Sequence, residues 1–152
     1  MPPCPRGLRR DRRRPGRAAP EGFLRSTEGL MDGAVKVVIQ LSEGEEARMA
    51  QALNNAANLT RYYAERGFAL VIEVVCFGPG VSLLRADRTP FAARVAELAG
   101  RPVHFSACAN TLHGLAQAEG AVPPLLPQAR VVPSGAAHVI ELQRAGYAYL
   151  RP

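Results

Sequence analysis

The regular alternation of β-branched runs with stretches of helical period constrains this chain more than any other feature. Val35–Leu41 is a run rich in valine and isoleucine, which is typical of a strand that is covered on both faces. Four further strand-like runs follow, at Phe68–Phe77, Val103–Ala107, Ala129–Val132 and Tyr147–Leu150. Strands separated by helical stretches predict βαβ units, and therefore an α/β fold built on a parallel sheet.

Capping and breaking residues mark where the helices between these strands begin and end. Ser42 and Glu45 have the spacing of a capping box, and Gly67 is placed to end the helix that follows. Thr89 before Pro90 predicts the start of the second helix. The other helix boundaries are predicted at Gly100, at Cys108 and Glu119 or Gly120, and at Pro133-Ser134-Gly135 and Gly146.

The net charge of +6 is concentrated near the N-terminus. Residues 1–30 contain eight arginines against three acidic residues, a net charge of +5, whereas residues 31–152 carry only +1. The folded part is therefore nearly neutral and lacks the basic face that binding to phosphates requires. This distribution excludes nucleic acid as the main partner.

Residues 1–30 also differ from the rest of the chain in being rich in proline and arginine. The segment has too few apolar residues to offset the entropy of ordering it, which predicts a disordered extension. Its functional interpretation is an electrostatic tether to an acidic partner, whereas Met31 is an alternative start of translation that would leave the extension out. Residues 31–152 are then expected to form one domain with a single core.

The three cysteines, Cys4, Cys76 and Cys108, are few and odd in number, which argues against a disulfide framework. A reducing compartment is favoured, and we expect the protein in the cytoplasm. The chain contains no run of about 18 apolar residues, and its arginine-rich start is not followed by the apolar segment of a secretory signal. We therefore expect no membrane association.

Ligands of open parallel sheets collect beyond the carboxyl ends of the strands. Four segments of this chain are predicted to lie there: Ser42–Glu46, Cys76–Gly80, Cys108–Thr111 and Val132–Gly135. The residues that we predict to bind a ligand belong to the first three of these segments, and they are Ser42, Gly78, Pro79, Gly80, Asn110 and Thr111.

Cys108 is the strongest candidate for a reactive group. It follows a predicted strand and precedes a helix, where unpaired amides and the helix dipole favour an anionic thiolate. The amides of Ala109, Asn110 and Thr111 are placed to stabilise charge on the sulfur or on a persulfide that it carries. The alternative is that Cys108 is a small apolar residue buried at a strand end, as free cysteines often are.

Two further residues are candidates for auxiliary roles. His113 lies five residues beyond Cys108, so its ring would not point squarely back at the sulfur, and a Cys/His pair is only weakly indicated. Cys76 ends the second strand and is a candidate resolving thiol, although the preceding Val74-Val75 favours a buried core cysteine.

No metal or nucleotide cofactor is expected. The three histidines and the two cysteines of the domain do not have the spacing of a zinc site. Gly78-x-Gly80 has Leu83 where a dinucleotide-binding fingerprint would have its third glycine, and the phosphate-binding loop of nucleotide hydrolases is also missing from the sequence.

Several short segments follow one another in a fixed order over residues 34–152. They are Val37-Val38-Ile39 with Ser42-Glu43-Gly44, then Ala52 to Leu59, Val74 to Gly80, Phe105 to Leu112, and the terminal Gly146 to Pro152. This series resembles the DsrE/DsrF-like family, and specifically its small YchN-like members. The resemblance implies a three-layer α/β/α fold with a five-stranded, mainly parallel sheet, assembled as a homotrimer or hexamer.

The resemblance also implies a chemistry. Better-studied relatives relay sulfur as a cysteine persulfide in a loop after a central strand, and Cys108 is the position here that looks like its counterpart. We therefore expect a cytoplasmic sulfur carrier without a cofactor, which exchanges sulfur with a donor or acceptor protein and resembles a sulfurtransferase.

Two alternatives remain open. One is a non-enzymatic oligomeric module that binds a small ligand or a protein through Asn110, Thr111 and the Gly78-Pro79-Gly80 loop. The other is a redox sensor that uses Cys76 and Cys108.

Overall fold

The computed structural model describes residues 33–152, so the extension predicted over residues 1–30 lies outside the described part of the chain. The first strand begins at Val35, close to the start of the described residues. The elements in chain order are β1 (Val35–Leu41), α2 (Glu46–Glu65), β2 (Leu70–Cys76), the 3₁₀ helix η1 (Gly78–Leu84), α3 (Ala92–Ala99), β3 (Val103–Cys108), α4 (Ala109–Glu119), β4 (Ala129–Val132), α5 (Gly135–Arg144) and β5 (Ala148–Leu150).

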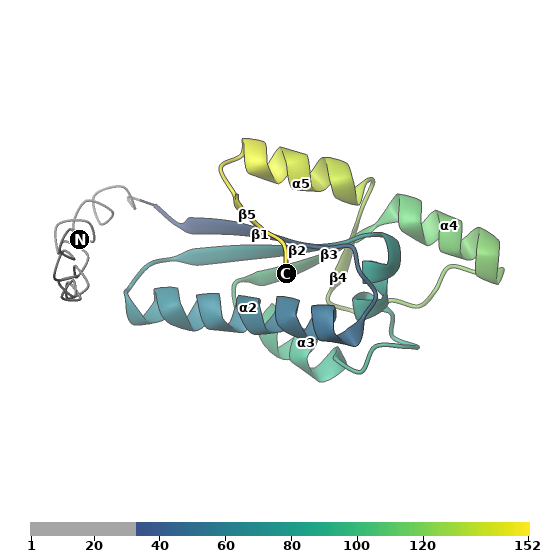
Figure 1. Ribbon diagram of the computed structural model, residues 1–152, viewed down its shortest axis with the longest axis horizontal. Coiled ribbons are helices and arrows are strands. Elements are labelled where there is room, and N and C mark those ends of the chain that lie inside the picture. The colour runs from purple at the N-terminus through teal and green to yellow at the C-terminus, as the bar shows by residue number, and fades with distance from the viewer. Residues whose placement is uncertain (1–32) are drawn as a thin grey trace, which may run out of the picture. The chain divides into compact units, whose positions relative to one another are not determined.

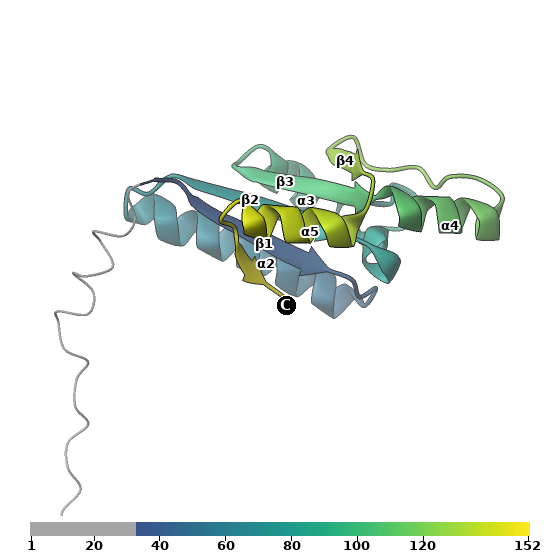
Figure 2. The same ribbon diagram turned by 90° about the horizontal axis from the view of Figure 1, so that it is seen from above.

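The five strands form one sheet in the order β4-β3-β2-β1-β5, and every neighbouring pair is parallel. β2, β3 and β4 are added successively on one side of β1, and β5 returns to its other side. Because parallel crossovers are right-handed, this reversal places α5 on the face opposite α2 and α3 (Figures 1 and 2). The three-layer α/β/α fold expected from the sequence is confirmed.

The larger core lies between the sheet and α2 and α3. Alternate residues of the three central strands point into it, as Ile39, Val74 and Phe105 do with none of their surface exposed. α2 covers this side because four small or apolar residues at helical spacing lie on one of its faces: Met49, Ala52, Leu53 and Ala56.

The opposite face of the sheet is covered by α5 and buries far less apolar surface. Its core consists of Val38, Val75 and Val139, with Phe77, Leu142 and Tyr147 packed around them. Two buried polar residues, Glu73 and Ser106, lie on strands β2 and β3. The two layers of helices therefore rest on surfaces of different chemistry.

Two helices begin later than their caps predict. α2 starts at Glu46, and the Glu45 carbonyl accepts its first helical bonds, from Arg48 and Met49. Ser42 does not cap it; the Ser42 hydroxyl instead accepts a 3.3 Å bond from Gln40. The link after β1 is thus extended rather than helical, which is why the capping-box prediction was wrong.

The second late start is that of α3, which begins at Ala92. Thr89 does accept a hydrogen bond, from the Phe91 amide at 3.2 Å, but that bond closes a turn before the helix. The 3₁₀ helix η1 was not predicted from the sequence, and its Val81, Leu83 and Leu84 are fully buried. The loop after β2 is therefore part of the core.

α4 projects beyond the carboxyl edge of the sheet (Figure 1). Leu112 is the buried residue of this helix. Its far end is held by Arg85, which is only 3% exposed and forms paired hydrogen bonds of 2.8–3.0 Å with Asp87 and of 2.8 Å with Glu119. This ion-pair network fixes the direction of a helix that has little apolar contact of its own.

Candidate functional site

The loops that follow β1, β2 and β4 pack against one another at the carboxyl edge of the sheet. Gly80 is pressed against the end of β1, where any side chain would collide with the Leu41 carbonyl. A Cβ atom on Gly135, the first residue of α5, would lie 2.8 Å from the Phe77 side chain. Glycine is required at both positions because backbone and ring approach so closely.

Cys108 ends β3 at this edge and precedes the first residue of α4. Along β3, Phe105 and Ala107 point into the larger core, so Ser106 and Cys108 point to the α5 face. Cys108 is buried, with 5% of its surface exposed. Its sulfur therefore lies under the first turns of α4 and α5.

The surroundings of Cys108 favour the thiolate. Burial acts to raise the pKa of the thiol, but hydrogen bonding outweighs it, and the pKa lies below its ordinary value of 9.0. The groups responsible are, in order of effect, the Gly135 amide, the amide and then the hydroxyl of Thr111, and the Asn110 amide. Cys108 does not form a side-chain cap hydrogen bond on α4.

The Thr111 hydroxyl connects Cys108 to the loop after β2. It accepts a 2.9 Å hydrogen bond from the Gly78 amide, and the same hydroxyl helps to lower the pKa of the Cys108 thiol. Gly78 has a φ of +55°, a conformation that side chains disfavour. Three predicted site residues, Gly78, Cys108 and Thr111, are thus brought together.

Cys76 lies at the same edge but on the other side of the sheet. It is fully buried in the larger core, and burial raises the pKa of its thiol well above the ordinary value. Cys76 pairs in register with Ala107, which also points into that core. The sheet therefore separates Cys76 from Cys108, and the structure does not bring the two thiols together.

The other predicted residues lie around this centre rather than in it. His113 is exposed, and its ring hydrogen-bonds Gln117 on the next turn of α4 rather than the sulfur. Pro79 and Asn110 are exposed, whereas Gly80 is buried and Ser42 half-buried. Of this group, only the Asn110 backbone acts on Cys108.

Sequence reasoning missed two contributions to the site. The Gly135 amide, at the start of α5, acts on Cys108 together with those of Thr111 and Asn110, whereas the sequence predicted the amides of Ala109, Asn110 and Thr111. A polar cluster on the α5 face was also missed: Ser106 donates to Glu73 at 2.5 Å, and His138 of α5 lies 3.3 Å from the same carboxylate oxygen. The one sequence signal for this cluster was Glu73, a charged residue within the β-branched run of β2.

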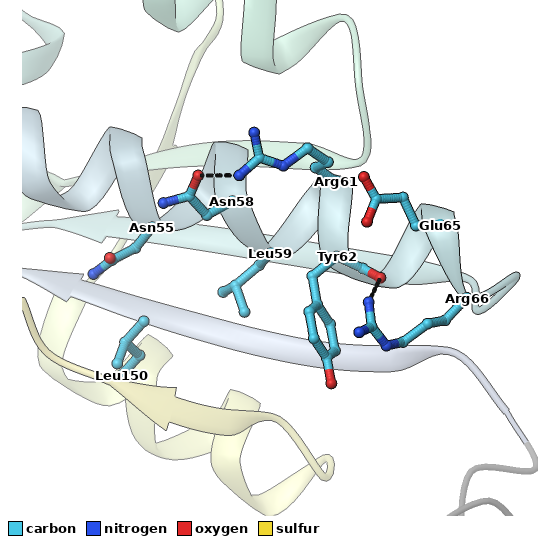
Figure 3. Close-up of a pocket in the computed structure, with 8 residues that line it drawn as sticks. All are labelled: Asn55, Asn58, Leu59, Arg61, Tyr62, Glu65, Arg66 and Leu150. Atoms are coloured by element: carbon cyan, nitrogen blue, oxygen red, sulfur yellow. Dashed lines mark hydrogen bonds between the residues drawn. The ribbon is translucent and has the colours of Figure 1, made fainter.

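A separate hollow of about 420 Å³ lies along α2 and β5 (Figure 3). The guanidinium of Arg66 stacks on Tyr62 at 3.5 Å from the ring centroid, and Arg61 hydrogen-bonds Asn58 at 3.2 Å. Its lining residues are Asn55, Asn58, Leu59, Arg61, Tyr62, Glu65, Arg66 and Leu150. None of them contributes to the surroundings of Cys108.

Two classes of feature are missing from residues 33–152. No helix in this part of the chain is long and apolar enough to cross a membrane. Nor do three or more His, Cys, Asp or Glu side chains gather there as a metal site would require.

Fold and site together define a small three-layer α/β/α protein with one polarised thiol at the carboxyl edge of its sheet. Comparison with protein families gives a match over residues 35–152 to the DsrE/DsrF-like family. This chain belongs to that family. No curated protein matches the sequence.

A solved structure supports the assignment. It is that of a protein of unknown function, MTH1491 from Methanobacterium thermoautotrophicum, which is 36% identical in sequence. The match covers 78% of this chain and 99% of that one, with a TM-score of 0.68. The family is associated with sulfur relay.

Proposed function

We propose that this protein carries sulfur as a persulfide on Cys108. The observation that carries the proposal is the position of Cys108 at the end of β3, directly before α4 and in register with Val132, three residues before the start of α5. Backbone amides at the starts of both helices hold the pKa of its thiol below the ordinary value. A cysteine in these surroundings is a better nucleophile at neutral pH than a free cysteine, because a larger fraction of its thiol is ionised. The family association with sulfur relay gives the direction of the chemistry.

The proposed transfer needs no oxidant or reductant. The Cys108 thiolate attacks the terminal sulfur of a donor persulfide; a new S–S bond forms on Cys108, the donor S–S bond breaks, and the donor leaves as a thiolate. An acceptor thiolate then attacks the terminal sulfur on Cys108 and regenerates the Cys108 thiolate. The transferred sulfur keeps its oxidation level throughout, so the donor can be a cysteine persulfide, and the acceptor a cysteine thiol, of another protein.

The geometry also suits the loaded state. In the persulfide, the anionic charge lies on the sulfur bonded to Cys108 Sγ. The backbone N–H groups and the Thr111 hydroxyl that act on the Cys108 thiolate are then available to this outer sulfur. Oriented amides stabilise an anion without the cost of reorganising water. The 5% exposure of Cys108 restricts access, so small sulfane-sulfur donors are the appropriate probes.

The test is sulfur loading of the full-length protein followed by intact mass. Reduced protein is incubated with a small sulfane-sulfur donor; we expect a mass gain of one sulfur that Cys108→Ser lacks and that Cys76→Ala and Cys4→Ser retain. Cys76→Ala is the matched control, because it removes the other thiol of the domain. A gain that survives Cys108→Ser would remove this cysteine from the mechanism.

The alternative of a ligand-binding module predicts a different result. Cys108 would then be unreactive toward the sulfur donor, and no variant would differ from the parent protein in mass gain. The homo-oligomer, the partner proteins and the cytoplasmic location expected from the sequence stay predictions.

A further inference from the structure

The polar cluster on the α5 face joins three elements that are distant in the sequence. Glu73 on β2 is 7% exposed, and Ser106 on β3 is 1% exposed. The Ser106 hydroxyl donates to Glu73 Oε1 at 2.5 Å, and Nε2 of His138, on α5, lies 3.3 Å from the same oxygen. The side chain of His138 is 28% exposed, so it forms the lid of the cluster.

A buried carboxylate is a costly way to fill this space. Taking a carboxylate out of water is unfavourable, and replacing it by an apolar side chain of similar size would often leave the stability unchanged or raise it. The neighbouring residues of this face, Val38, Val75 and Val139, show that apolar packing is available. What a hydrogen-bonded carboxylate adds, and an apolar residue cannot, is a fixed direction for its partners.

α5 is the element that needs such a direction. Its buried residues are Gly135 and Val139, and the apolar contact of Val139 with Val38 and Val75 of the sheet does not by itself set the rotation or position of the helix along the sheet. One residue of helical shift moves the backbone by about 1.5 Å, enough to take an amide out of hydrogen-bonding range.

The cluster and Cys108 form a closed ring of contacts. Ser106 and Cys108 are two residues apart on β3 and share a face; Ser106 bonds Glu73, Glu73 bonds His138, and His138 lies one helical turn after Gly135. Cys108 pairs in register with Val132, three residues before Gly135, so the first turn of α5 begins next to Cys108 and closes the ring. The ring therefore connects the Glu73–His138 hydrogen bond to the position of Gly135 relative to Cys108.

We propose that Glu73 and His138 are positioning residues that fix the first turn of α5 over the sheet, so that the Gly135 amide stays directed at Cys108 Sγ. Ser106 anchors the carboxylate within the sheet. The purpose of this pair rests on the sulfur-carrier function proposed above, but its physical effect is on the thiol itself and can be measured without any sulfur donor.

The experiment is the rate of Cys108 alkylation against pH in the full-length protein, in a Cys4→Ser and Cys76→Ala background. His138→Leu keeps most of the volume of the side chain but cannot donate to Glu73, whereas His138→Gln can. We expect His138→Leu to move the midpoint of the pH profile upward and to slow alkylation several-fold at pH 7. His138→Gln should restore most of the parent profile.

His104→Gln is the matched control. His104 is exposed on the same face of the sheet and pairs in register with Glu73, so its loss should leave the midpoint unchanged. A merely structural effect of His138→Leu would lower the thermal midpoint of unfolding without moving the pH profile. If the Leu variant does not fold, the same comparison is made between His138→Ala and His138→Gln.

Two results would overturn the proposal: an unchanged pH profile in the folded non-donating variant, or an equal shift in His138→Gln. Sulfur loading of the parent protein is measured in parallel. A parent protein that fails to load sulfur but shows the expected shifts refutes the carrier function and leaves the positioning pair standing. The reverse pattern refutes the pair alone.

Discussion

The two faces of the sheet bury their residues in different ways. The face under α2 and α3 is apolar throughout its core, with Phe105 and Ile72 fully buried among aliphatic side chains. The face under α5 combines a three-valine patch with the Glu73–Ser106–His138 cluster and Cys108. Apolar packing supplies stability without direction, whereas hydrogen bonds supply direction with only a modest net gain in stability.

Each face also has one cysteine at the same edge of the sheet, which makes the comparison direct. Burial alone acts on Cys76 and raises the pKa of its thiol. Around Cys108 burial acts in the same sense, but the amides of Gly135, Thr111 and Asn110 reverse the net direction. The difference shows that oriented hydrogen-bond donors, and not burial alone, decide the direction in which the pKa of each thiol moves.

The largest expected effect is the difference in reactivity between the two cysteines. In the native protein at pH 7.5, Cys76 should react with iodoacetamide at least about a thousandfold more slowly than Cys108, because each pKa unit changes the thiolate fraction about tenfold and Cys76 is also inaccessible. Timed quenching and peptide mapping give both rates in one sample. Comparable alkylation rates would show that the two cysteines do not differ in reactivity as their surroundings predict.

A second, smaller effect concerns stability. Phe105→Ala in the larger core should lower the free energy of unfolding by about 3–5 kcal/mol. Val139→Ala on α5 should cost only about 1–2 kcal/mol, because the truncated side chain is smaller and packs in the thinner layer. Urea denaturation of both variants measures the two costs. Equal costs would mean that the α5 face is as much a core as the other.

The smallest expected effect is the pH dependence of stability, in which the two thiols have opposite signs. The lowered pKa of Cys108 contributes stability that is present above the ordinary value of 9.0 and lost as pH falls through the native pKa, so its contribution rises with pH in that window. The raised pKa of Cys76 contributes stability that is present below 9.0 and lost as pH rises above it.

Urea denaturation between pH 7 and 10 measures both contributions. Cys108→Ser should flatten the rise below pH 9, and Cys76→Ala should flatten the fall above it. If the pH dependence of the free energy of unfolding is the same in each variant as in the parent protein, groups other than these two thiols govern it between pH 7 and 10.

Local sequence patterns were sufficient to predict most of the architecture. The bounds of β1 and β4 follow from their own side chains, and Ser134 caps α5 by accepting from the Ala137 amide at 3.3 Å, as its spacing predicts. Gly120, in the left-handed conformation, ends α4. These features depend on residues within one turn of each other, where spacing alone carries the information.

The site itself was predictable only in part, because its decisive contacts join distant segments. The position of Cys108 at a strand end could be derived from its neighbours, but the Gly135 amide reaches it from beyond another strand and a long loop. Likewise, the partners of Glu73 lie on β3 and α5, and those of Arg85 include Glu119 at the end of α4. Spacing along the chain does not encode such pairings.

The return of the chain to the far side of β1 has a consequence for the order in which the protein becomes competent. Gly135, the first group among those that lower the pKa of Cys108, begins α5, and α5 lies between β4 and β5, the strands at opposite edges of the sheet. Because both of these strands follow Cys108 in the chain, we expect the full effect on its thiol only after β4 and β5 have joined the sheet. Before that point, only the groups of Thr111 and Asn110 on α4 would act on the sulfur.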